Sequence, residues 1–97
     1  MPKGYWVTIY RSISDPKKLA AYAELAPKAT TPFGCKYLAR GTAAAAYEAG
    51  LKDRIVISEF PSVEQATAAY NSPGYREALK ALGDGAVRDL RIVAGLE

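Results

Sequence analysis

The segment Arg54-Ile55-Val56-Ile57-Ser58-Glu59-Phe60-Pro61-Ser62-Val63-Glu64-Gln65-Ala66 decides the fold, because it predicts a buried strand that leads directly into a helix. Residues 55–57 are β-branched and suit a packed, pleated sheet. Pro61 ends the strand, since proline cannot donate a hydrogen bond to the ladder. Ser62 and Gln65 have the spacing of a capping box, and an apolar stripe at helical spacing continues to Tyr70.

The composition predicts one globular domain that spans residues 1–97, with 49% hydrophobic and 24% charged residues. No uncharged run reaches the length of a membrane span, and the first residues enter a strand pattern without an apolar signal segment. We therefore expect a cytoplasmic protein without a membrane segment. Cys35 is the single cysteine, which excludes an intrachain disulfide and a CxxC site, and we interpret it as a small buried hydrophobe.

The net charge of +3 makes the chain mildly basic. Its thirteen Lys and Arg residues are spread along the sequence rather than clustered. This spread is typical of a solvated surface and disfavours nucleic-acid binding.

The first half of the chain predicts a strand, a helix and a second strand. Residues 5–11 form the first strand, and Asp15 followed by proline begins the helix. Pro27 should kink that helix or split it in two, and Gly34 suits a left-handed position at its end. The second strand spans residues 35–41. Residues 42–53 are interpreted as an irregular or partly extended hairpin arm.

After the deciding segment, Ser72 and the proline behind it break the helix and start a short second one. Residues 83–85 end that helix, and residues 89–95 form the last strand. The order β-α-β-β-α-β predicts an α+β, ferredoxin-like fold. Right-handed crossovers would place the helices on one face of a four-stranded antiparallel sheet.

The helices can cover only one face of this sheet, so the other face should be polar in a lone domain. In two strands, however, both alternating sets of side chains are bulky and apolar. The sets are Tyr5, Val7 and Ile9 against Trp6 and Tyr10 in the first strand, and Ile55 and Ile57 against Val56 and Phe60 in the third. An exposed face of this kind exceeds what soluble monomers tolerate. We therefore predict a homodimer that packs sheet against sheet, and the competing explanation is a face that binds RNA or a ligand.

Several motifs also carry a family resemblance that covers essentially the whole chain. They are Lys3-Gly4-Tyr5-Trp6, Asp15-Pro16, Tyr37-Leu38-Ala39-Arg40-Gly41, Glu59-Phe60-Pro61-Ser62 and Tyr70-Asn71-Ser72-Pro73-Gly74-Tyr75. Together they resemble the bacterial family known as domain of unknown function 1330, and only residues 42–53 depart from its pattern. The resemblance implies membership of the dimeric α+β-barrel superfamily. That superfamily includes cofactor-free monooxygenases, haem-degrading enzymes and small-molecule isomerases, which is an analogy of fold alone.

The chain contains no histidine, which excludes His-dependent triads, His-ligated haem and the common zinc sites. No carboxylate cluster has metal-ligand spacing, so we expect no metal and no cofactor. Gly83-Asp84-Gly85 follows a helix rather than a strand, and is therefore a turn rather than a dinucleotide-binding loop.

Arg40 and Glu59 are the weak candidates for catalysis, and both are candidate ligand-binding residues. Alternation places Lys36 and Arg40 on one face of the second strand. A simple hairpin with Gly41 opposite Arg54 puts Lys36 opposite Glu59, either as a cross-strand ion pair or with Glu59 as a base or ligand anchor between sheet and helices. Arg40 would bind an anionic group or pair across the dimer.

Trp6, Tyr70, Ser72 and Tyr75 complete the candidate ligand-binding residues. The tyrosines flank the break between two helices, where they would be core residues with bonded hydroxyls or would line a pocket. Ser72 is interpreted first as a helix cap. Trp6 would pack on the sheet or stack on an aromatic ligand.

Three functions remain open. The first is a homodimer that binds a small apolar or aromatic metabolite, or transforms it without a cofactor. The second is an RNA-binding module, although residues 55–59 lack the aromatic residues that such domains carry and Glu59 would repel phosphate. The third is a structural or regulatory dimer without a ligand.

Overall fold

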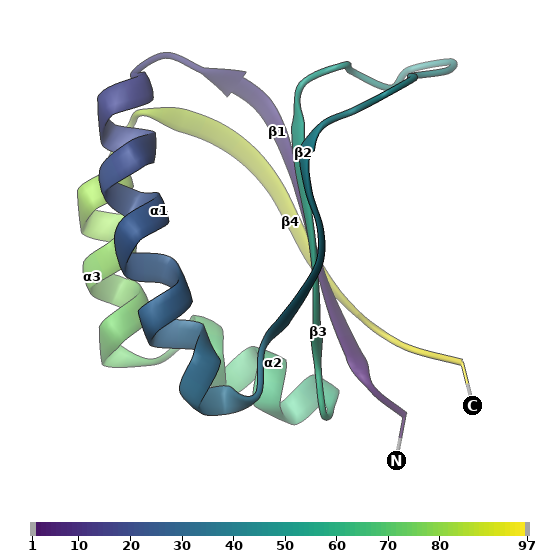
Figure 1. The fold of residues 1–97 in the computed structure, drawn as a ribbon, viewed down its shortest axis with the longest axis vertical. Helices are drawn as coiled ribbons and strands as arrows, with labels where there is room; N and C mark the ends of the chain where they lie inside the picture. Colours follow the sequence, from purple (N-terminus) through teal and green to yellow (C-terminus); the bar gives the residue numbers. More distant parts are fainter. Residues whose placement is uncertain (1, 97) are drawn as a thin grey trace.

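The computed structural model describes residues 2–96, which form one four-stranded antiparallel sheet with helices on one side (Figure 1). The elements are β1 (Gly4–Ile13), α1 (Pro16–Thr30), a 3-10 turn (Thr31–Phe33), β2 (Lys36–Thr42), β3 (Arg54–Phe60), α2 (Val63–Tyr70), α3 (Pro73–Leu82) and β4 (Ala86–Ala94). The strand order β2-β3-β1-β4 confirms the predicted ferredoxin-like fold. Helices α1 and α3 lie side by side, and α2 lies at one end of the layer.

The predicted helix starts are confirmed by their capping hydrogen bonds. Ser62 Oγ accepts a hydrogen bond from the backbone N–H of Gln65 at 3.1 Å, and Ser72 Oγ accepts one from Tyr75 at 3.2 Å. Asp15 caps α1 in the same way, with its carboxylate accepting from the backbone N–H groups of residues 17 and 18. These caps satisfy donors that a helix cannot satisfy internally.

Of the two predicted effects of Pro27, the split of the first helix is wrong, because α1 runs through this residue to Thr30. Pro27 lies in the last turn, where its missing N–H costs a single hydrogen bond. Two hydroxyls bind nearby carbonyls: Thr30 Oγ1 donates to Ala26 O at 3.0 Å, and Thr31 Oγ1 donates to Pro27 O at 2.6 Å. The helix end is therefore held by side chains.

The predicted faces of the second strand are also wrong beyond Tyr37. Lys36 pairs with Glu59 as expected, but the register shifts between Tyr37 and Ala39, so that Gly41 pairs with Ile55. One extra residue in β2 makes a bulge, and a bulge reverses the alternation of the side chains that follow it. As a result, Tyr37 and Arg40 share a face, with the Arg40 guanidinium 4.6 Å from the centre of the Tyr37 ring.

The hairpin arm after β2 is irregular, as the sequence predicts. Residues 43–53 contain no helix or strand. The arm is closed at its base by a hydrogen bond from Ala43 N to Asp53 O, and a turn lies between Tyr47 and Gly50.

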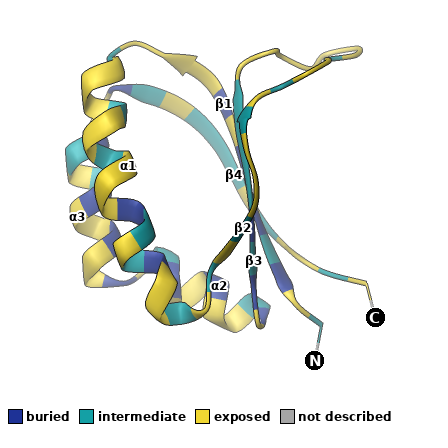
Figure 2. Cartoon of the chain, viewed as in Figure 1, coloured by how far each residue is buried: buried dark blue, intermediate teal, exposed yellow. Residues whose placement is uncertain are grey.

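The core lies between β1, β3 and the helices, where buried residues gather (Figure 2). Trp6 is its centre: its ring stacks on Phe60 at 5.6 Å and meets the edge of Tyr75 at 5.1 Å. Small residues, among them Ala66 and Ala78, are fully buried and let the helices approach the sheet. Offset and edge-to-face ring pairs of this kind stabilise a core beyond their buried area.

The outward face of the sheet is apolar at its centre. Along β1 the buried residues alternate with Tyr5, Val7 and Ile9, so these three point away from the helices. Val7 pairs with Ile57 on one side, and Val93 continues the apolar surface on β4. In the single chain, Ile9 is 39% exposed and Val93 56% exposed. Among the described residues, no helix is both long and apolar enough to cross a bilayer.

Candidate functional site

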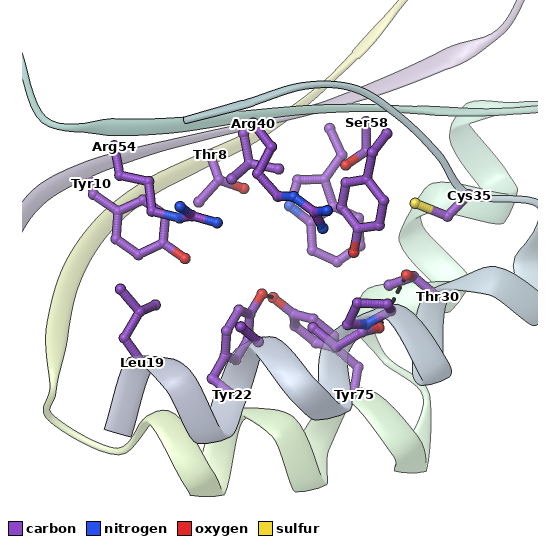
Figure 3. A pocket seen from close by; sticks show the side chains of 16 residues that line it. Thr8, Tyr10, Leu19, Tyr22, Thr30, Cys35, Arg40, Arg54, Ser58 and Tyr75 are labelled. Atoms are coloured by element: carbon purple, nitrogen blue, oxygen red, sulfur yellow. Dashed lines mark hydrogen bonds between the residues drawn. The ribbon is translucent and has the colours of Figure 1, made fainter. Parts of the chain in front are cut away.

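A cavity of about 50 Å³ lies between the inner face of the sheet and the helices. Side chains of β1, α1, β2, β3 and α3 line it (Figure 3). A cavity of about 150 Å³ holds a benzene molecule, so this one, as it stands, encloses a few water molecules or a group the size of a carboxylate. Arg40 lines it and is exposed, so the cavity reaches solvent near this residue.

The helix side of the cavity carries a buried network of hydroxyl groups and one cation. The hydroxyls of Tyr22 on α1 and Tyr75 on α3 lie 2.5 Å apart and meet at the cavity (Figure 3). Arg88 on β4 donates to both oxygens, at 3.0 Å to Tyr22 and 3.4 Å to Tyr75. Its guanidinium also lies 4.8 Å from the centre of the Tyr22 ring. The network ties two helices and an edge strand together.

Tyr22, Tyr37 and Tyr75 of this cavity stay protonated at neutral pH. Burial raises the pKa of Tyr75 far above the ordinary value, and the neighbouring Tyr22 raises it further, although Arg88 opposes both effects. Burial likewise raises the pKa of Tyr22 and of Tyr37. These hydroxyls can therefore donate hydrogen bonds, but they are poor general bases.

The sheet side of the cavity carries two arginines. Arg40 and Arg54 extend from β2 and β3 toward the tyrosine pair (Figure 3). Arg54 lies 6.0 Å from the centre of the Tyr10 ring, and its Nε is buried without a hydrogen-bond partner in the described chain. A buried, unpaired donor of this kind is costly.

The structure separates the predicted candidates into two groups. Trp6, Arg40 and Tyr75 line the cavity, and Trp6 also packs in the core. The interpretation of Glu59 as an anchor between sheet and helices is wrong, because Glu59 lies on the outward face. Its carboxylate accepts a hydrogen bond from Tyr5 at 3.2 Å and forms an ion pair at 3.4 Å with Lys3 rather than with Lys36.

Tyr70 and Ser72 do not line the cavity. The ring of Tyr70 packs between Trp6, at 5.7 Å, and Tyr75, at 5.2 Å. Ser72 caps α3 and donates its hydroxyl proton to Ala69 O at 2.7 Å, so both hydrogen-bonding roles of its hydroxyl are filled.

Sequence reasoning missed three residues of the site: Tyr22, Arg54 and Arg88. The signal was present, because Arg54 follows the two-residue period of Val56 and Ser58, which also line the cavity. Arg88 pairs with Tyr10 on the inward face of the sheet. Among residues 2–96, no group of three His, Cys, Asp or Glu side chains lies close enough together to hold a metal ion.

The family model described as a domain of unknown function (DUF1330) matches residues 3–96. The chain belongs to the DUF1330 family. No curated protein matches this DUF1330 chain.

Several solved structures share the fold of this DUF1330 protein. RPA0582 of Rhodopseudomonas palustris, of unknown function, has a TM-score of 0.76 at 21% identity, over 99% of this chain and 84% of its own. A dimeric ferredoxin-like protein of unknown function from Thermobifida fusca has a TM-score of 0.64 at 19% identity, over 96% of this chain and 91% of its own. SnoaB of Streptomyces nogalater, a cofactor-independent oxygenase, has a TM-score of 0.65 at 9% identity, over 100% of this chain and 96% of its own. At these identities the likeness shows the ferredoxin-like α+β fold alone.

Proposed function

We propose that the protein is a homodimer that binds a small apolar or aromatic metabolite in the cavity between sheet and helices. The observation that carries this proposal is a cavity into which polar groups point from both layers, namely the guanidinium groups of Arg40 and Arg54 and the hydroxyls of Tyr22 and Tyr75 (Figure 3). Binding sites in proteins typically combine apolar walls with a few such convergent polar groups.

The lining residues favour binding over acid–base chemistry. None of them is Asp, Glu or His, and the tyrosines among them with shifted pKa values are held protonated. Among the described residues, the lining therefore offers no carboxylate or imidazole as a general base. A cofactor-free transformation, such as the one named for the structural relative SnoaB, would require a ligand that ionises by its own chemistry.

The homodimer is supported by the outward face of the sheet. Its apolar centre includes Val7 and Ile57, and charged pairs flank it at both ends. Glu59 pairs with Lys3 at one end, and Asp89 binds Arg91 at the other. A second copy packed about a two-fold axis would bury the apolar centre, and the structural relative described as dimeric has the same fold.

A ligand screen on the full-length protein tests the binding site. Trp6 is the single tryptophan and lines the cavity, so its fluorescence reports occupancy. Small apolar and aromatic compounds that bind there should change this fluorescence and raise the midpoint of thermal unfolding.

Ala23 lines the cavity and tolerates a larger side chain, because it is partly exposed, so Ala23→Leu should weaken binding. Ala20→Leu, on the solvent side of α1, should not. Equal binding by both variants would refute the site.

A further inference from the structure

The cavity carries positive charge that no carboxylate of residues 2–96 compensates by an ion pair. The ion pairs of residues 2–96 engage other basic residues, namely Lys3, Arg11, Lys18, Lys80 and Arg91. Arg40, Arg54 and Arg88 instead lie against aromatic rings at 4.6 to 6.0 Å. Two of these three arginines line the cavity, and the third donates to the tyrosine pair that lines it. A cleft of one sign with low-dielectric walls concentrates ligands of the opposite charge.

Arg54 lines the cavity and offers its guanidinium to it. Its Nε is buried, and in the described chain no acceptor lies within hydrogen-bond distance of this atom. Burying an unsatisfied donor of a charged group costs more than burying a neutral one. An anionic oxygen in the cavity would form a charge-assisted hydrogen bond with the guanidinium of Arg54.

The tyrosine pair has one hydroxyl proton to spare. Tyr22 and Tyr75 each carry one O–H, and only one of these protons can lie between their oxygens at 2.5 Å. Arg88 has no acceptor groups and only donates to the pair, so it cannot use the second proton. That proton is free for another acceptor, and the hydroxyls face the guanidinium groups of Arg40 and Arg54 across the cavity (Figure 3).

We propose that the natural ligand is a small organic acid whose carboxylate lies between Arg54, Arg40 and the spare hydroxyl proton of the Tyr22–Tyr75 pair. This inference rests on the proposed function and specifies its ligand class. The cavity of about 50 Å³ admits a carboxylate with one or two carbons, and the rest of the ligand extends through the open side. The planar fork of a guanidinium matches the two oxygens of a carboxylate. The apolar lining, which includes Val56 and Leu19, suits a hydrocarbon chain or ring.

Matched pairs of acids and amides test the charge requirement. Butyrate and benzoate are titrated into the full-length protein at constant ionic strength, beside butyramide, benzamide and inorganic phosphate, with Trp6 fluorescence as the readout. Each acid should bind about tenfold or more tightly than its amide, since only the acid offers a charged acceptor. Phosphate should bind more weakly than butyrate, because it has no hydrocarbon part.

Charge-matched variants separate the cavity from the general surface. Arg54→Gln should bring the affinity for the acid down to that for the amide. Arg54→Lys keeps the charge but loses the planar fork, so its affinity for the acid should lie between those of wild type and Arg54→Gln. Arg76→Gln removes the same charge from the exposed surface of α3 and should leave both affinities unchanged. Circular dichroism checks that each variant is folded.

The remaining outcomes distinguish the two proposals. Equal affinity for acids and amides, both weakened by Ala23→Leu, would overturn the carboxylate inference and keep the binding site. Stronger binding of phosphate than of butyrate would also overturn the carboxylate inference. An acid preference that Arg76→Gln removes as fully as Arg54→Gln would assign it to the surface and overturn the inference. If neither acids nor amides affect Trp6, the inference and the proposed function both fail.

Discussion

Replacing Tyr75 with phenylalanine tests the buried hydroxyl network through the pH dependence of folding stability. At pH 8 the variant loses the hydrogen bond to Tyr22 and the longer one from Arg88. A net hydrogen bond contributes about 1 kcal/mol, and the 3.4 Å contact contributes less, so we expect a loss of about 1–2 kcal/mol in the free energy of unfolding.

At alkaline pH the same variant should regain its deficit. The pKa of Tyr75 is about 10 in the unfolded chain and is raised in the folded protein, mainly by burial. The stability that comes from this shift is complete below about pH 10 and is lost as the pH rises toward the folded pKa, because the unfolded chain releases a proton that the folded protein keeps. Wild type therefore loses about 1.4 kcal/mol by about pH 11 through Tyr75, a loss that Tyr75→Phe does not suffer.

The assay is urea unfolding followed by circular dichroism between about pH 8 and pH 11. The gap between wild type and Tyr75→Phe should shrink to about zero over this interval. Tyr47, which is 80% exposed, provides the control: Tyr47→Phe should give a stability curve parallel to that of wild type. A gap for Tyr75→Phe that stays constant across the interval would refute the reasoning, because Tyr75 would then ionise alike in both states.

Two further variants test local structure by urea unfolding. Gly34 has φ of +87°, and a Cβ there would lie 2.8 Å from the Pro61 ring. Gly34→Ala should therefore lower the free energy of unfolding by about 1–2 kcal/mol. Gly41→Ala is the control and should lower it much less, because no neighbouring atom lies within 4 Å of the added Cβ. Ser62→Ala removes the cap on the backbone N–H of Gln65 and should lower the free energy of unfolding by about 1 kcal/mol. A loss below about 0.3 kcal/mol would show that the cap is dispensable.

The fold could be predicted from sequence because its signals are local. A β-branched run, a proline and a capping serine define the junction between β3 and α2, and the same chemistry at Ser72 defines the break before α3. The bulge in β2 could not be predicted, since an extra residue leaves no mark on the alternation of Leu38 and its neighbours. The split at Pro27 was predicted in error because the proline lies in the last turn of α1, where its missing N–H costs a single backbone hydrogen bond and the helix continues to Thr30.

The candidate site could be predicted only in part, for a related reason. Trp6 and Tyr75 were found because bulky aromatic residues stand out in any sequence. Arg54 and Arg88 were missed because arginine on a strand is usually a surface residue, and only the register shows that both face inward. Glu59 was misplaced because alternation assigns residues to two faces without telling which face the helices cover.

We propose that a second copy of the chain covers the apolar outward face of the sheet, and sedimentation velocity tests this homodimer most directly. Wild type should sediment with twice the chain mass of 10.4 kDa at micromolar concentration. Ile57→Glu should give the single-chain mass, because it places a charge on the outward face between Val7 and Ala39, and Ala21→Glu on the exposed surface of α1 should leave the larger mass unchanged. A wild-type protein that sediments with the single-chain mass at every concentration would contradict the homodimer.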